Sequence, residues 1–219
     1  EVQSISVAAR NAANAQSMLD TADGSLGETH KILLRMRELA VQSSNDTVRD
    51  QDRDMLQTEV AQLEAEIQRI SDDTTWSGMT LLAGGFTTGA TFQIGPRDTD
   101  TIQISLSGID ATLATGLVLA SHVSTQAAAQ DYIVTIDNAI SIISADRAKY
   151  GATINRLDHA MANMANIVTN LSAAKGRIAD ADYASESANL ARTQVLQQAS
   201  MAMLSQANAS KQNILSLFQ

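Results

Sequence analysis

The sequence predicts a mainly α-helical protein: a long antiparallel, coiled-coil-like helical rod with a small β-hairpin and a C-terminal helix. Three observations support this fold class. Apolar residues recur in steps of three and four over very long stretches, which is the pattern of a heptad seam. Only 3% of the residues are aromatic and Pro96 is the single proline, so aliphatic side chains must build the core of uninterrupted helices. Two short alternating segments lie between the helical stretches.

The first helix is predicted over about residues 2–43, because its apolar positions step by three and four without a break. Gly24 and Gly27 each cost about 1 kcal/mol in a helix interior, which the seam must outweigh. The members of the seam are Ile5, Ala8, Ala12, Ala15, Leu19, Ala22, Leu26, Thr29, Leu33, Met36 and Ala40.

The segment from Ile32 to Gln42 has more apolar residues than one helical stripe needs, since a stripe facing one core is about 100° wide. The surplus must therefore face a second partner, a ligand or a membrane. Leu33, Met36 and Ala40 belong to the seam, whereas Leu39 and Arg35 lie one turn apart off it, on a face that a second partner could reach.

A second helix is predicted over about residues 48–71. The run of Ser, Asn, Asp and Thr at 43–47 favours a turn and supplies N-cap residues, so the chain is expected to double back as a helical hairpin. The shorter seam of this helix consists of Leu56, Val60, Leu63, Ile67 and Ile70.

A third stripe predicts a helix over about residues 130–175, and Arg147 is its only charged member. A seam of this length needs an equally long partner, and the first helix is the one candidate within the chain, so the two are expected to lie side by side. The stripe consists of Ile133, Ile136, Ile140, Ile143, Arg147, Tyr150, Ile154, Leu157, Met161, Met164, Val168 and Leu171.

Between the helices, residues 91–95 and 101–106 alternate apolar and polar around a Pro-Arg-Asp-Thr-Asp turn, which predicts a β-hairpin over about 91–106. Residues 107–130 have weak periodicity and are interpreted as a short variable connection. Together with the three helices, these segments form a predicted rod domain over residues 1–177.

Residues 178–219 are predicted to form a separate helical segment whose apolar residues cover much of its circumference. Such a helix needs a partner, and the terminal apolar residues would otherwise be exposed by fraying. The residues expected to pack against that partner are Val195, Leu196, Ala199, Met203, Leu204, Ile214, Leu215, Leu217 and Phe218.

Composition limits the possible partners and compartments. The chain has 24 acidic and 15 basic residues, a net charge of −9, which disfavours nucleic-acid binding. It has no cysteine, so disulfides and thiolate metal sites are excluded. No apolar run approaches the roughly 18 residues of a membrane span, and residues 1–20 lack the features of a secretory signal. Helical pattern begins at once without an initiator Met, so a preceding N-terminal piece is expected.

No pattern of an enzyme, a metal site or a cofactor is found. His30, His122 and His159 have no ligand partners at metal spacing. Asp180 and Asp182 are explained as acids that complement a helix dipole rather than as a catalytic pair. Gly84 and Gly85 are not followed by the lysine of a phosphate-binding loop. The eight methionines are interpreted as core filler.

Several long runs resemble bacterial flagellin. SMLDTADGSLGETHKILLRMRELAVQSSNDT resembles the first long helix of that family, with its RMRELAVQ signature, and QTEVAQLEAEIQRISDDTTWSGMTLLAG resembles the second helix and the following loop, with Trp76 as a loop anchor. TFQIG is similar to the hairpin, and RIADADYASESANLARTQVLQQASMAMLSQANASKQNILSLF is similar to the C-terminal helix. The resemblance covers about residues 1–106 and 131–219. Within these 219 residues we find no match to the family's first inner-core helix or to a large variable outer domain.

This resemblance implies a structural subunit for motility. Such a chain is exported unfolded through the flagellar type III apparatus and polymerises with further copies into an extracellular filament. Before export, in the cytoplasm, a flagellin export chaperone would cover the C-terminal helix. The apolar terminal helix agrees with this expectation, because burial of its surface would couple folding to association.

The resemblance also implies a surface that an innate-immune receptor of animals could recognise. In flagellins recognised by the animal Toll-like receptor for flagellin, the matching positions are Arg35, Leu39 and Glu59. Subunit packing is the expected role of these residues, and receptor binding is an additional hypothesis.

Two alternatives stay open at the level of sequence. The hook-filament junction protein of the same superfamily shares the terminal core pattern. A cell-surface flagellin homologue acting as a polysaccharide receptor belongs to a different functional class, although the stretch 108–130 has no aromatic residue to line a sugar-binding groove.

Overall fold

The computed structural model describes residues 1–84, 89–106, 123–179 and 182–216, with side chains described as far as Ser210. The chain divides into two units, Glu1–Thr169 and Asn170–Gln219. They are called unit 1 and unit 2 below, and each is described by itself. The predicted fold class, long helices with a small antiparallel sheet, is confirmed.

Unit 1 begins with helix α1 (Val2–Ser43), which is followed by helix α2 (Asp50–Asp73). Two short hairpins come next, β1 (Thr75–Trp76) with β2 (Met79–Thr80) and β3 (Ala90–Gln93) with β4 (Thr101–Ile104). Helix α3 (Gln126–Ala179) begins at Gln126 rather than at about residue 130, and its last turns belong to unit 2.

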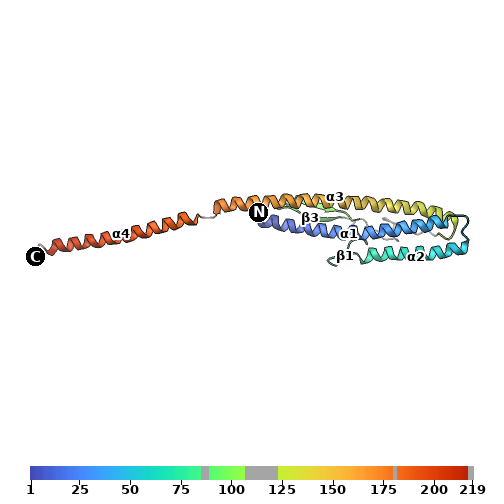
Figure 1. Cartoon of the computed structure of the whole chain (residues 1–219), viewed down its shortest axis with the longest axis horizontal. Coiled ribbons are helices and arrows are strands. Elements are labelled where there is room, and N and C mark those ends of the chain that lie inside the picture. The colour runs from blue at the N-terminus through green and yellow to red at the C-terminus, as the bar shows by residue number, and fades with distance from the viewer. Residues whose placement is uncertain (85–88, 107–122, 180–181, 217–219) are drawn as a thin grey trace. The chain divides into compact units, whose positions relative to one another are not determined.

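Within unit 1, α1 lies beside both α2 and α3 (Figure 1), and the polar contacts show that each pair is antiparallel. Arg37 and Asp137 join α1 to α3 at 2.6 Å, while Asp23 and Arg147 join the same two helices at 2.8 Å further along. These contacts agree with the expectation that the first and third helices lie side by side.

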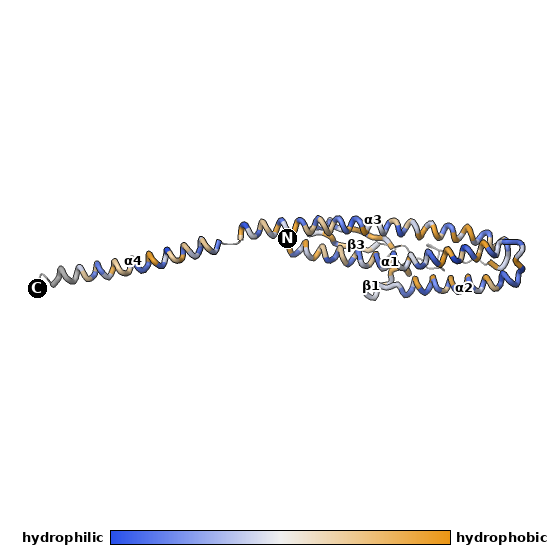
Figure 2. The backbone as a smooth tube through the Cα atoms, in the orientation of Figure 1, coloured by the Kyte–Doolittle hydropathy of each residue, from blue (hydrophilic) through white to orange (hydrophobic). Residues whose placement is uncertain are grey.

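The core lies along the predicted seam of α1. All eleven predicted positions are buried, from Ile5 to Ala40, and so are Met18, Leu39 and Ser43. Hydrophilic and hydrophobic residues follow one another in bands along α1 and α3 (Figure 2), as expected for helices with one buried stripe. The seam buries enough aliphatic surface to carry Gly24 and Gly27 within one continuous helix.

The buried stripe of α3 differs from the prediction. Ile136, Ile143, Tyr150, Leu157 and Met164 are buried as expected. At the alternate positions the buried residues are Tyr132, Ala139 and Asp146, where the heptad pattern indicated Ile133, Ile140 and Arg147. α3 contacts α2 as well as α1, because the Tyr132 hydroxyl donates to Glu64 of α2 at 2.7 Å while Asp137 and Arg147 pair with residues of α1. A helix with two neighbours buries a wider face than one heptad stripe indicates.

Unit 1 contains two β-hairpins. The predicted hairpin is present, with Thr91 opposite Gln103, and the Asn11 amide of α1 donates to the Gln93 carbonyl at 3.2 Å. The β1–β2 hairpin was expected to be a loop. Ser77 and Gly78 both have positive φ, 51° and 80°, which is the backbone of a type I′ turn and explains why two strands form there.

Candidate functional site

The described residues contain no group of three or more His, Asp or Glu side chains that could hold a metal ion. His159 is exposed on α3, His30 is half-buried on α1, and both His122 and Asp180 lie outside the described residues. Asp182 accepts hydrogen bonds from the backbone N–H groups of Ala184 and Ser185 at 3.0 and 3.3 Å. It therefore caps helix α4, in agreement with the interpretation of this acid as a helix-start residue.

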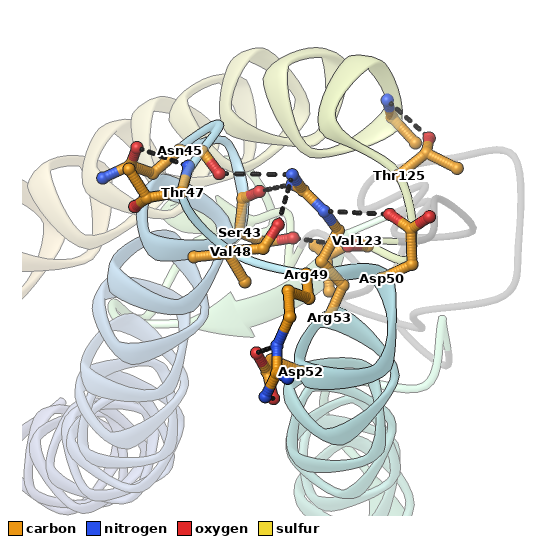
Figure 3. A network of polar contacts seen from close by, with 11 residues as sticks. Ser43, Asn45, Thr47, Val48, Arg49, Asp50, Asp52, Arg53, Val123 and Thr125 are labelled. Atoms are coloured by element: carbon orange, nitrogen blue, oxygen red, sulfur yellow. Dashed lines mark hydrogen bonds and ion pairs between the residues drawn. The ribbon is translucent and has the colours of Figure 1, made fainter.

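The turn between α1 and α2 is organised by Arg53, a buried residue with 4% of its surface exposed (Figure 3). Its guanidinium donates to the carbonyls of Ser43, Asn45 at 3.2 Å and Val48 at 2.9 Å. Asp50 forms a longer ion pair with it at 3.5 Å. These contacts satisfy the Ser43 carbonyl at the end of α1 and tie down two carbonyls of the turn that follows it.

The same turn also holds the chain just before α3. The Ser43 hydroxyl donates to the Val123 carbonyl at 2.5 Å, and the Val123 N–H donates to the Gln57 side chain at 2.6 Å. Arg53 was missed at the sequence level. A cation in the first turn of a helix opposes the helix dipole, and this anomaly was the available signal.

Arg35 and Glu59 face each other across α1 and α2, with Nε and Oε1 2.9 Å apart. Arg35 also contacts Glu38 at 3.0 Å, and about half of its side chain is exposed. The hydrogen bond to Glu59, followed by that to Glu38, raises the pKa of Arg35. The structure thus brings two of the three predicted surface residues together in an accessible ion pair.

Leu39 does not belong to this surface. It is only 1% exposed, so the expectation that it lies on an open face beside Arg35 is wrong. Leu39 is buried together with the seam residues Met36 and Ala40, and α2 pairs with α1 through the nearby Arg35, so the buried face of α1 is wider than the seam alone. The exposed apolar residues of this segment are instead Leu34 and Val41.

Unit 2 contains helix α4 (Tyr183–Ser216). Of the residues predicted to pack against a partner, Val195, Leu196, Ala199, Met203 and Leu204 are exposed on it. Leu196 is 60% and Met203 71% exposed. The side chains of Ile214 and Leu215, and all of Leu217 and Phe218, lie outside the described part of the chain. α4 therefore presents large apolar side chains on its surface.

Comparison with known proteins decides the family. Residues 1–87 match the family model of the bacterial flagellin N-terminal helical region, and residues 133–218 match that of the C-terminal helical region. A flagellin of Halalkalibacterium halodurans is 39% identical over 219 residues, covering 100% of this chain and 80% of the relative. The chain belongs to the bacterial flagellin family.

Solved structures agree with this assignment. The crystal structure of Bacillus cereus flagellin has 33% sequence identity and a TM-score of 0.64, with 76% of this chain and 94% of that chain covered. A protein described as a flagellar hook-associated protein, from Vibrio parahaemolyticus, has a TM-score of 0.66 at 17% identity, covering 79% and 92%. At that identity the second likeness shows the shared fold alone, so the family assignment rests on the two family models and on the curated relatives.

Among the described helices of this chain, none is both long enough and apolar enough to cross a membrane.

Proposed function

We propose that this chain is a structural subunit of the bacterial flagellar filament and assembles with copies of itself outside the cell. Its membership of the flagellin family at both terminal regions carries this proposal. The physical support comes from α4. Exposed apolar side chains such as Leu196 and Met203 lower the free energy of the system when they leave water, so their burial between subunits can drive assembly.

Polymerisation of the purified protein tests the proposal. Residues 1–219 are studied by themselves and also with a family N-terminal helix placed before Glu1, and both forms are inspected by electron microscopy after seeding with short filament fragments. Helical filaments from either form are the expected result. If neither form elongates the seeds, the subunit assignment is overturned, and short capping complexes at seed ends would favour the junction-protein alternative.

An export chaperone is the proposed partner of α4 before assembly. The chaperone would cover the exposed apolar residues in the helix-in-groove mode, which keeps the chain monomeric in the cytoplasm until the type III apparatus exports it. Calorimetric titration of a flagellin export chaperone tests this. Leu196→Ser with Met203→Ser should weaken binding at least about tenfold, since each removes a large apolar contact. Gln197→Ser and Gln198→Ser on the same helix are the matched control, and equal affinity of both double variants would reject the proposal.

The exposed Arg35–Glu59 pair supports receptor recognition as a second property. An Arg side chain held by two carboxylates is preorganised for contact with a partner, which is typical of interface hot spots. Arg35→Ala is expected to weaken binding of a purified Toll-like receptor ectodomain for flagellin, while Lys31→Ala, an exposed cation of the same helix, should not. If the receptor binds the Arg35→Ala variant with unchanged affinity, this part of the proposal is wrong.

A further inference from the structure

A groove in unit 1 carries an excess of negative charge. It lies between α1 and α2, has a volume of about 450 Å³, and is lined by Glu28, Glu66 and Asp73 with Arg69 as the one lining cation, while Lys31 pairs with Glu28 at 2.8 Å without lining the groove. All of α2 shares this bias, since Asp50–Asp73 contains eight carboxylate side chains and two arginines. Opposite charges on a partner would therefore be attracted to this side of the molecule.

The floor of the groove is apolar. Ile32 of α1 and Ile70 of α2 line it and are half-buried. Arg69 is held by Glu66 and by Asp73, with Nη1 3.0 Å from the latter, and this arrangement lowers the pKa of Glu66 so that the carboxylate stays charged at neutral pH. Carboxylates above an aliphatic floor suit long basic side chains, which lay their methylene stems on apolar surface and keep the charged end in water.

A complementary surface lies elsewhere on unit 1. Lys149, Ala152, Arg156, His159 and Asn163 follow one another at spacings of three and four along α3, so they share one face of that helix. All five are exposed, and the Lys149 side chain is 69% exposed although its ammonium group contacts the buried Asp146 at 2.7 Å. The small side chain of Ala152 lies between the two long cations on this face. This set is called the basic stripe.

We infer that the groove of one subunit receives the basic stripe of a neighbouring copy, with Lys149 and Arg156 placed over Ile32 and Ile70 among the carboxylates of Glu28 and Glu66. A helical polymer requires such a pairing of two different patches, because a contact between identical patches closes into a dimer. The inference rests on the proposed filament function and names the partner of this groove as a second copy of the chain.

Charge reversal on each surface tests the pairing in whichever form of the chain elongates filament seeds. The groove variant is Glu28→Lys with Glu66→Lys, which leaves the Arg69–Asp73 pair in place. The stripe variant is Lys149→Glu with Arg156→Glu. Each alone should raise the critical concentration for elongation at least about tenfold, because like charges then face each other across the interface.

The combined variant, with both surfaces reversed, restores opposite charges and should elongate within about threefold of the wild type. Asp20→Lys with Asp54→Lys is the matched control: it also changes one exposed acid on each of α1 and α2, but neither lines the groove. Circular dichroism and thermal unfolding of every variant establish that the monomers fold alike.

The outcomes separate the two proposals. A wild-type chain that fails to elongate seeds overturns the filament function itself. If the wild type elongates and the single-surface variants do so equally well, the pairing is wrong while the function stands. If each single-surface variant fails and the combined variant elongates no better than either, the two surfaces do not face each other, and the pairing is likewise rejected.

Discussion

Arg147 of α3 and Asp23 of α1 form a two-pronged ion pair: Nε donates to Oδ1 at 2.8 Å and Nη2 donates to Oδ2 at 3.1 Å. The hydrogen bond raises the pKa of Arg147, and the paired geometry fixes the two helices in one antiparallel register. Arg147, the charged member of the predicted seam, therefore sits at the edge of the helix pair rather than within it.

Asp23→Asn is expected to lower the free energy of unfolding by about 0.5–1 kcal/mol, because a pair that is partly open to water contributes modestly. The melting temperature should fall by about 1–4 °C in a chain of this size. Differential scanning calorimetry measures the change. Asp20→Asn, an exposed acid of the same helix, is the control, and an equal loss in both variants would contradict a specific role for the pair.

Arg53→Ala is expected to lower the free energy of unfolding by about 2–4 kcal/mol, because it removes three hydrogen bonds at the α1–α2 turn, including the buried one to the Ser43 carbonyl. Urea unfolding gives the magnitude, and amide exchange should accelerate first between Ser43 and Val48. Arg49→Ala is a close control four residues earlier. Its side chain is 78% exposed and pairs with Asp52, so a loss of less than about 0.5 kcal/mol is expected. Equal losses for both arginines would show that burial of Arg53 does not matter.

Gly24→Ala and Gly151→Ala should each stabilise the protein by up to about 1 kcal/mol, since a Cβ added at either site meets no atom within 4 Å and alanine favours helix. Gly95→Ala provides the contrast. A Cβ there would lie 2.5 Å from Cβ of Asp100, so the hairpin must shift and the protein should lose stability. Thermal unfolding of the three variants checks the opposite signs. A destabilising effect at Gly24 and Gly151 would refute the prediction.

The environment of Tyr132 leads us to expect that the free energy of unfolding decreases in alkaline solution. Burial, reinforced by the hydrogen bond to Glu64, raises the pKa of Tyr132 above its ordinary value. Above about pH 10 the unfolded chain releases the phenolic proton while the folded chain retains it, so stability present below that pH falls as pH rises. Urea unfolding between pH 9 and pH 11 measures the slope.

Tyr132→Phe serves as the control for this pH dependence. At pH 8 the free energy of unfolding of this variant should be about 1 kcal/mol lower than that of the wild type, because the hydrogen bond to Glu64 is lost. From pH 9 to pH 11 it should decrease less steeply than in the wild type. Identical slopes for the two proteins would show that another group is responsible.

Periodicity alone identified most of what is local in this flagellin. The eleven predicted seam residues of α1 are all buried, and the β3–β4 hairpin lies where alternation indicated. These features follow from a period of 3.6 or 2 that each segment carries within itself. The motif resemblance added the family, which composition and spacing could not provide.

Tertiary structure decided which flank of each stripe is covered. A repeat fixes the centre of a helix's apolar face, but the position of a second neighbour depends on contacts between residues far apart in the chain. For that reason Leu39 and Arg53 are buried although their patterns did not indicate it. On α3, Tyr132 contacts Glu64 of α2, Asp146 is buried, and Arg147 pairs with Asp23 of α1. The sequence determined the helices and their inner faces, and only their packing decided which remaining faces stay open to partners.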